Sequence, residues 1–303
     1  MIINGSNFKV MIELNKIYNE DCIEGMKRIP DNSIDCIVTD PPYMYLKNQK
    51  LDRPFDEQAF FSECKRVLKK DAFIVLFGRG TSFYRWNCIL SDMGFSFKEE
   101  IIWDKCYNSS PLLNISRVHE SISIHSIGKT KFNKCRIPYI EMQKYDNDRI
   151  IRDIKRLSNV LGNPKSLQLV KDYLDNGTIV SNETQTQNNL SISSTINISD
   201  RCINTMRCIK EGIIEKTVIR LHRDHYNTIH PTQKPVRLLE RLLALVSQEE
   251  CTVLDPFSGS ASTAIACINT NRNYIGFELD KEYYDLSITR INNVMYDRSR
   301  KTR

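Results

Sequence analysis

The sequence of 303 residues lacks the features that mark membrane-spanning, zinc-binding and disulfide-rich proteins. Its apolar runs are far too short to cross a bilayer, and its N-terminus lacks the charged-then-apolar layout of a signal peptide. None of the ten cysteines forms a CxxC pair, and the nearest two, Cys202 and Cys208, have no partners at ligand spacing. We therefore expect a cytoplasmic protein with reduced cysteines, no metal and no membrane partner.

A strong charge of either sign is also missing, because 43 Lys and Arg stand against 37 Asp and Glu. The surplus of six is unevenly placed. Residues 128–225 hold 17 basic and 11 acidic side chains, which accounts for all of it. A polyanion such as DNA would be attracted there, although an ordinary solvated surface can have the same composition. The length permits one large domain or two small ones.

The strongest chemical signal is the stretch Asp40-Pro41-Pro42-Tyr43, which follows an apolar run typical of a buried strand. The prolines end this strand, because they lack N–H donors and fix φ at about −65°. The Asp40 carboxylate and the Pro41 carbonyl can accept both hydrogens of a nucleobase amino group, and the Tyr43 ring can stack on a base that has left its helix. A proline-terminated strand without such a role would contain the same residues.

The flanking segments alternate between strand and helix patterns, which favours a parallel sheet with right-handed crossovers. The expected strands cover residues 14–18, 34–39, 72–78, 97–103 and 121–127. The expected helices cover residues 23–29, 55–70 and 82–93. Asp21 either lies on the same rim as Asp40 or caps the helix that follows it. Residues 44–54 are expected to form a mobile loop over the site.

The last quarter of the chain carries a nucleotide-type pattern. A strand over residues 252–255 leads into the small residues 256–263 and a helix over 264–269, so that backbone N–H groups can approach a ligand closely. Glu278 ends the next strand, 19 residues beyond Gly259, where an acidic side chain can bind ribose hydroxyls. A final helix is expected over residues 281–294, followed by a frayed basic tail.

Between these halves, residues 128–222 break the alternation and are expected to form an insertion or a small second domain. Helices are expected near residues 148–160 and 166–174, and the polar, low-complexity residues 178–199 are expected to form a loop or an edge hairpin. Regular structure resumes at His230-Pro231-Thr232-Gln233-Lys234-Pro235. There Pro235 can begin a helix that Thr232 or a neighbouring group caps.

Together these stretches resemble the β-class DNA amino-methyltransferases, which use S-adenosylmethionine. The resemblance is carried by VTDPPY (residues 38–43), HPTQKP (230–235), LDPFSGS (254–260) and YIGFELD (274–280), in that order, with lesser matches at residues 101–105 and 118–120. It implies an α/β fold, a doubly wound Rossmann-like methyltransferase sheet with an inserted target-recognition region. Residues 1–127 and 223–303 would form the catalytic core, and residues 128–222 would recognise the target.

The resemblance also implies roles for individual residues. Asp40, Pro41, Pro42 and Tyr43 would be the catalytic turn, which holds the amino group and stacks on the flipped base. The cofactor would be bound by Asp21, His230, Thr232, Gln233, Lys234, Asp255, Phe257, Gly259, Ser260 and Glu278. One departure is Ala261, where the family usually has a second glycine. Because alanine resists positive φ, this residue could weaken cofactor affinity.

Asp at the head of the catalytic turn favours adenine over cytosine among such enzymes, so the expected reaction is site-specific methylation of N6 of adenine in double-stranded DNA. Methylation of N4 of cytosine, of RNA or of a protein amide, and an inactive DNA-binding homologue, are the alternatives. A bacterial or phage-encoded protein of a restriction-modification system is expected. A homodimer is compatible with the resemblance. No nuclease motif is present, so a restriction endonuclease would be a separate chain.

Overall fold

The computed structural model describes residues 12–43, 52–107, 114–162, 164–176, 198–223 and 228–301. The chain divides into two compact units. Residues 1–133 and 216–303 form one, the core unit, and residues 134–215 form the other, the inserted unit. The boundary predicted from the sequence at this end was residue 222. It falls earlier because β8 (Val218–Arg220) joins the sheet of the core unit.

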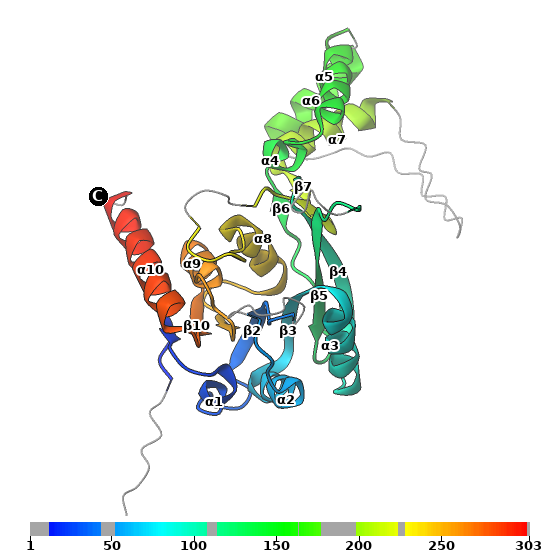
Figure 1. Cartoon of the computed structure of the whole chain (residues 1–303). Helices are drawn as coiled ribbons and strands as arrows, with labels where there is room; N and C mark the ends of the chain where they lie inside the picture. Colours follow the sequence, from blue (N-terminus) through cyan, green and yellow to red (C-terminus); the bar gives the residue numbers. More distant parts are fainter. Residues whose placement is uncertain are drawn as a thin grey trace, which may run out of the picture. The chain divides into compact units, whose positions relative to one another are not determined.

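The core unit is built on one eight-stranded sheet, whose strands follow the order β1-β10-β9-β2-β3-β5-β4-β8 (Figure 1). Besides β8, its strands are β1 (Lys16–Tyr18), β2 (Ile34–Thr39), β3 (Leu68–Gly78), β4 (Ser96–Asp104), β5 (His119–Ser126), β9 (Thr252–Asp255) and β10 (Asn273–Phe277). All neighbours are parallel except β5, which is antiparallel to both β3 and β4. The expected parallel sheet is therefore mixed, although its α/β character is confirmed.

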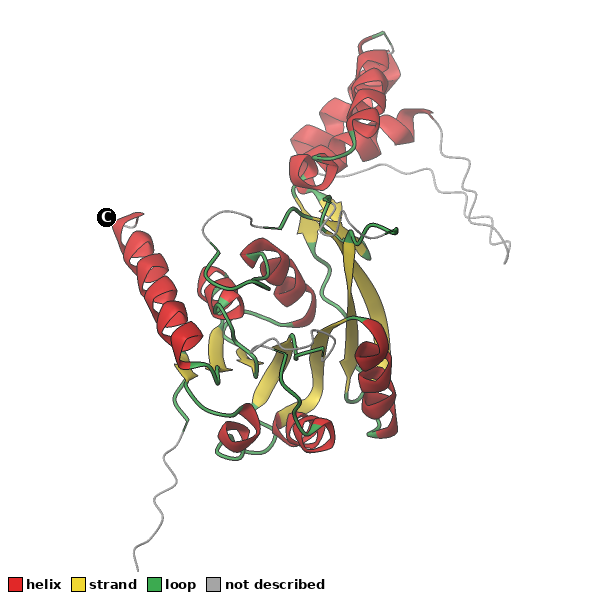
Figure 2. Ribbon diagram, in the orientation of Figure 1, coloured by secondary structure: helices red, strands yellow, loops and turns green. Residues whose placement is uncertain are grey.

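Helices cover both faces of this sheet, as Figure 2 shows. They are α1 (Cys22–Met26), α2 (Glu57–Val67), α3 (Gly80–Asp92), α8 (Val236–Val246), α9 (Ser262–Asn269) and α10 (Lys281–Lys301). Side chains of α1, α2 and α3 pack in one buried cluster, and those of α8, α9 and α10 pack in the other. Because side chains alternate along a strand, Val75 faces the second cluster while Ile74 and Leu76 face the first. Burial on both faces explains the continuous apolar runs of the sequence.

The strand order reverses between β2 and β9, which are far apart in sequence but adjacent in the sheet. Ile37 lies opposite Leu254 in this parallel pair. From here β3 continues in one direction, whereas β10 and β1 continue in the other. The residues that follow β2 and β9 therefore leave the same edge of the sheet side by side. In open α/β sheets, ligands bind at such a switch point, beyond the carboxyl ends of the strands.

Several element boundaries differ from those expected. Helix α2 ends at Val67, because Leu68 already pairs with Ile34 as the start of β3. Helix α10 continues to Lys301 instead of fraying after Val294, since the Arg298 guanidinium donates hydrogen bonds to the Ile268 carbonyl and the Asn271 side chain. The expected mobile loop falls largely on residues 44–51, and most of the expected polar loop falls on residues 177–197. Both segments lie outside the described residues.

The inserted unit is mainly helical. Its elements are β6 (Arg136–Ile137), α4 (Tyr139–Gln143), α5 (Asn147–Leu161), α6 (Pro164–Asn176), α7 (Ile198–Glu211) and β7 (Ile213–Ile214). Helices α5 and α6 confirm the two expected helices, whereas α7 had no counterpart in the sequence prediction. A small apolar cluster around Val170, Cys202 and Ile203 joins α6 to α7. In neither unit does the described part of the chain contain a helix long and apolar enough to span a membrane.

Candidate active site

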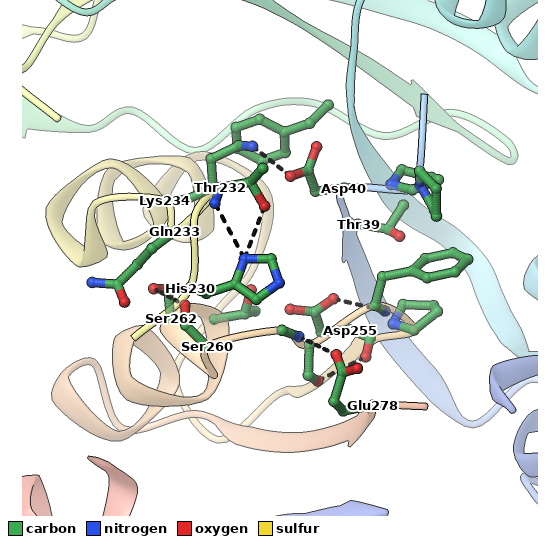
Figure 3. Close-up of a pocket in the computed structure, with 18 of the residues that line it drawn as sticks. Thr39, Asp40, His230, Thr232, Gln233, Lys234, Asp255, Ser260, Ser262 and Glu278 are labelled. Carbon is green, nitrogen blue, oxygen red and sulfur yellow. Dashed lines mark hydrogen bonds and ion pairs between the residues drawn. The ribbon is translucent and has the colours of Figure 1, made fainter. Parts of the chain in front are cut away.

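A cavity of about 400 Å³ opens at the switch point of the core unit. It brings together every residue for which the sequence predicted a role, as Figure 3 illustrates for the labelled ones. These residues are Asp21, Asp40, Pro41, Pro42, Tyr43, His230, Thr232, Gln233, Lys234, Asp255, Phe257, Gly259, Ser260 and Glu278. Stretches more than 200 residues apart in sequence thus share one site. The individual role of each residue remains a prediction.

The turn after β2 presents Asp40 to this cavity with both carboxylate oxygens engaged. The Tyr43 hydroxyl donates to Oδ1. The Lys234 ammonium forms an ion pair with Oδ2 (Figure 3). Burial raises the pKa of Asp40 above its usual value, although the nearby Lys234 opposes this shift. The Asp40 side chain keeps 23% of its surface exposed, so a ligand in the cavity can still reach it.

Tyr43 is held in place through both its backbone and its side chain. Its carbonyl accepts a hydrogen bond of 2.7 Å from the Ser82 hydroxyl of α3, and its ring lies 6.2 Å from the buried ring of Trp86. The Tyr43 hydroxyl therefore reaches back to Asp40 from a ring that packs on α3. The ring is only half-buried, so part of its surface remains available to a flat ligand.

The segment before α8 supplies a neutral histidine and a buried lysine. His230 Nδ1 accepts a hydrogen bond of 3.2 Å from the Thr232 N–H, and burial lowers the pKa of His230 to about 4. Its proton therefore sits on Nε2, which lies 3.7 Å from the position that a Cβ on Gly259 would take. Thr232 does not cap α8 as expected. The residue before α8 is Pro235, and no side chain caps that helix.

Lys234 lies at the centre of a charge network that the sequence did not predict. Besides Asp40 it pairs with Glu120 at 3.2 Å, and Glu120 in turn pairs with Lys105 at 3.3 Å. The sequence had placed Lys234 only beside the cofactor. Lys105 and Glu120 fall within the two lesser stretches of the resemblance, which were the available signal for them. Arg79, Arg117 and Arg223 also line the cavity, although the sequence had assigned no role to any of them.

The turn between β9 and α9 forms the opposite wall. Asp255 accepts a hydrogen bond of 3.2 Å from the Phe257 N–H, and burial raises the pKa of Asp255 to about 7. Gly259 has φ +48°, a conformation that glycine adopts without strain. Glu278, at the end of β10, accepts hydrogen bonds of 2.8 Å from the N–H groups of Gly259 and Asp280. This carboxylate therefore ties the glycine turn to the neighbouring strand.

Ala261 adopts the left-handed conformation that the sequence analysis identified as difficult for alanine. Its φ is 60° and its ψ is 27°, and its methyl group is fully buried. Its N–H donates to the Ser258 carbonyl at 2.8 Å, and its own carbonyl accepts the N–H of Ile265 at 3.0 Å. The turn thus keeps a glycine-like shape, at a cost of about 1 to 2 kcal/mol in backbone strain.

Asp21 fulfils both of the alternatives that its position allowed. Its Oδ1 accepts hydrogen bonds from the N–H groups of Ile23, at 2.9 Å, and Glu24, at 3.2 Å, as a helix cap does. The same residue lines the cavity, as Glu278 does.

Known proteins are similar to this chain over most of its length. Residues 34–289 match the model of a family described as DNA methylase. The type II methyltransferase M.HinfI of Haemophilus influenzae is 26% identical over 308 aligned residues, which cover 93% of this chain and 69% of the relative.

Two solved structures share the fold. The complex of M1.HpyAVI with SAM gives a TM-score of 0.53 at 20% identity and covers 91% of this chain and 98% of its own. The cytosine-N4-specific PvuII DNA methyltransferase gives 0.57 at 14% identity, covering 92% and 86%. At these identities the likeness establishes the fold alone. The family model, however, spans most of the sequence and includes both walls of the cavity, so the chain belongs to the DNA methylase family.

Proposed function

We propose that this DNA methylase transfers the methyl group of S-adenosylmethionine to N6 of an adenine flipped out of double-stranded DNA. The observation that carries the proposal is that Asp40 and Glu278 face one cavity from opposite sides of the switch point. One wall offers acceptors for an amino group. The other offers a glycine turn, a helix N-terminus and a carboxylate of the kind that bind a nucleoside.

The residues of the second wall fit such a cofactor. A volume of about 400 Å³ lies within the range of small-molecule sites. Gly259 and the His230 ring lie next to each other on this wall, since a Cβ on Gly259 would lie 3.7 Å from His230 Nε2. Glu278 still has lone pairs for ribose hydroxyls after accepting its two backbone hydrogen bonds. When bound, the cofactor supplies an electrophilic methyl group on a positively charged sulfur.

The chain's own contribution is to position and activate the amine. An exocyclic amino group is a weak nucleophile, since its lone pair is delocalised into the ring. The Asp40 carboxylate and the Pro41 carbonyl accept hydrogen bonds from the two N–H groups of the amine, which draws the lone pair back onto nitrogen. Tyr43 stacks on the base and holds its plane. Orientation and charge placement then supply most of the rate acceleration.

Adenine is proposed over cytosine because an aspartate heads the catalytic turn. The inserted unit is proposed to recognise the DNA sequence. Every residue that lines the cavity belongs to the core unit, so the inserted unit takes no part in forming the cavity. Action in the bacterial cytoplasm, together with a separate restriction endonuclease, is proposed from the type II relative. A homodimer is compatible with these proposals.

The deciding experiment incubates the protein with S-adenosylmethionine labelled in its methyl group and genomic DNA, digests the DNA and separates the nucleosides. Label on N6-methyl-2′-deoxyadenosine supports the proposal, and label on deoxycytidine alone would refute the choice of base. RNA serves as a competing substrate, and preferential labelling of RNA would refute the substrate. The Asp40→Asn variant should lose turnover while binding the cofactor with little change, measured by calorimetry. Equal loss of both would contradict the division of labour between the two walls.

A further inference from the structure

Four charged side chains of alternating sign cross the inner wall of the cavity. Lys105, after β4, pairs with Glu120 of β5 at 3.3 Å, Glu120 pairs with Lys234 at 3.2 Å, and Lys234 pairs with Asp40 after β2. We call these residues the charge chain. Their side chains are only 4%, 16%, 10% and 23% exposed, in the order of the chain. Surface ion pairs contribute little, but this chain is largely removed from water.

The charge chain is assembled by the sheet. Strands β3, β5 and β4 lie side by side next to β2, and β5 runs opposite to the others. The start of β5 therefore meets the ends of β3 and β4 at the cavity edge, which places Glu120 between Lys105 and Asp40. Aromatic rings flank the lysines. Lys234 Nζ lies 5.2 Å from the ring centre of Phe77, and Lys105 Nζ lies 6.0 Å from that of Trp103.

We infer that Lys105, Glu120 and Lys234 are positioning residues that hold Asp40 ionised, with Oδ1 directed at the substrate amine. This inference rests on the proposed function. With Asp40 ionised, the four charges sum to zero, and each is next to a charge of opposite sign. Burial of a neutral alternating row costs far less than burial of one unbalanced charge. Since Lys234 occupies Oδ2, the amine is left with Oδ1, on which the Tyr43 hydroxyl lies in this structure.

Glu120 has a specific task within the charge chain. Its Oε2 is in ion-pair contact with Lys234 at 3.2 Å, so the Lys234 ammonium is shared between Glu120 and Oδ2 of Asp40. Glu120 thus also attracts Lys234 and limits how much positive charge Asp40 experiences. Lys105 balances Glu120. An acceptor that is ionised, but not over-stabilised by its own cation, can still take a hydrogen bond from a substrate.

The electrostatic effects of the two partners on Asp40 have opposite signs. Burial raises the pKa of Asp40, Lys234 lowers it, and Glu120 raises it. The other groups that face Asp40 are Tyr43, which donates a hydrogen bond to it, and Asp255 of β9. Loss of Lys234 and loss of Glu120 should therefore move the titration of Asp40 in opposite directions. A purely structural role would not produce this pattern.

The test compares Lys234→Met with Glu120→Gln in the full-length protein. In each, kcat/KM for methyl transfer to DNA is measured against pH, and the carboxyl carbon of Asp40 is titrated by carbon NMR without DNA or cofactor. The Asp40 signal is assigned by its loss in Asp40→Asn. Lys234→Met should move the acid limb and the titration upward by about 1 to 3 pH units, and Glu120→Gln should move both downward. The NMR titration is carried out in the Asp255→Asn background, because Asp255 is a neighbouring carboxyl group whose raised pKa would complicate the titration curve.

Three controls accompany the pair. Lys234→Arg keeps the charge and should leave the acid limb in place. The double variant Lys105→Met with Glu120→Gln removes one charge of each sign and should restore it towards that of the wild type. Lys281→Met removes a lysine whose side chain is 67% exposed and should change neither measurement. Circular dichroism of each variant checks the fold, and Glu120→Gln with Lys234→Arg tests the inference if Lys234→Met does not fold.

The outcomes separate the two proposals. If Lys234→Met and Glu120→Gln shift Asp40 in the same direction, or not at all, the inference is wrong even where the wild type methylates DNA. If the Asp40 titration moves as expected but the wild type transfers no methyl group to DNA, the proposed function is wrong and the charge chain stands.

Discussion

Asp40 and Asp255 lie at the carboxyl ends of the neighbouring strands β2 and β9, and the surroundings of their carboxyl groups differ. Asp40 faces a lysine, whereas Asp255 accepts a backbone hydrogen bond among small side chains and has its pKa raised to about 7 by burial. Environments that separate the pKa values of adjacent acids commonly mark functional sites. The sequence identified both residues, but only the folded environment sets their protonation.

The raised pKa of Asp255 predicts a pH-dependent stability. The folded protein keeps this proton up to about pH 7, whereas the unfolded chain loses it near the ordinary value of 3.8. Its contribution to the free energy of unfolding is therefore fully present below this window and is lost as pH rises through it. Asp255→Asn should remove that part of the decline in urea denaturation measured across the window. The matched variant Asp285→Asn, whose side chain is 58% exposed, should retain it.

Substitution of Glu278 is expected to lower both the stability of the protein and its affinity for the cofactor. Both of its oxygens accept buried N–H groups, so Glu278→Gln turns one acceptor into a donor and leaves one N–H without a partner. We expect destabilisation by about 1 to 3 kcal/mol in chemical denaturation. We also expect weaker cofactor binding in calorimetry, because the glycine turn is no longer held. Asn19, which donates to the Glu278 carbonyl at 2.8 Å, offers the control Asn19→Ala, which should leave the turn in place. Wild-type affinity in Glu278→Gln would contradict the proposed ribose contact.

At the scale of elements, a close contact near the site joins β10 to the turn after β9. A Cβ on Gly276 would lie 2.2 Å from the Ser258 hydroxyl, and 3.1 Å from the nearest carbon of the Ile17 side chain. Strand β10 thus needs a glycine there so that the Ser258 side chain of the turn can approach it. Nothing in the sequence around Gly276 revealed this requirement, because it arises from a contact across 18 residues.

This contact predicts that a second substitution, at Ser258, compensates for the damage caused by a substitution at Gly276. Gly276→Ala should lower the free energy of unfolding by about 1 to 3 kcal/mol, as overpacking does, and should weaken cofactor binding by displacing the turn. Adding Ser258→Ala removes the clashing oxygen and should recover part of both losses, which a double-mutant cycle by denaturation and calorimetry measures. Additive effects of the two substitutions would show that they do not meet in the way described.

Elements with a strong local pattern were predicted correctly from the sequence, whereas the ends of elements that depend on distant partners were not. The apolar face of α8 and the run of β2 are local properties, so their existence was predictable. The start of β3 at Leu68 depends on pairing with Ile34, and the length of α10 depends on what Arg298 contacts. Helix α7 forms where the low-complexity run ends, and its buried side is defined by α6.

At the scale of the whole molecule, the basic surplus of residues 128–225 is divided between the two units. The inserted unit, residues 134–215, holds 12 basic and 10 acidic residues. Most of the surplus belongs to the core unit next to the two boundaries. Its basic residues there are Lys129, Lys131, Lys216, Arg220 and Arg223. Phosphate attraction is therefore expected chiefly from the core unit, and sequence reading from the inserted unit.

This division predicts the result of an exchange of units. Replacing residues 134–215 with the corresponding unit of another family member should change the methylated DNA sequence, mapped as modified bases across a genome. Cofactor affinity should stay within about threefold, since every residue of the cavity belongs to the core unit. An unchanged methylated sequence would remove the proposed recognition role from this unit. The unexchanged protein is the control.

The sequence by itself determined the local chemistry of this protein. The order of strands and helices, the proline turn after β2, the small residues after β9 and the acidic end of β10 are each written in a few neighbouring residues. Only the tertiary structure decided which of these groups meet. Lys234 pairs with Asp40 from 194 residues away, and Glu120 lies between Lys234 and Lys105 because one strand runs against its neighbours. Short-range preferences fix a turn or a helix face, whereas strand order fixes which charges share a buried wall, and that order depends on the whole chain.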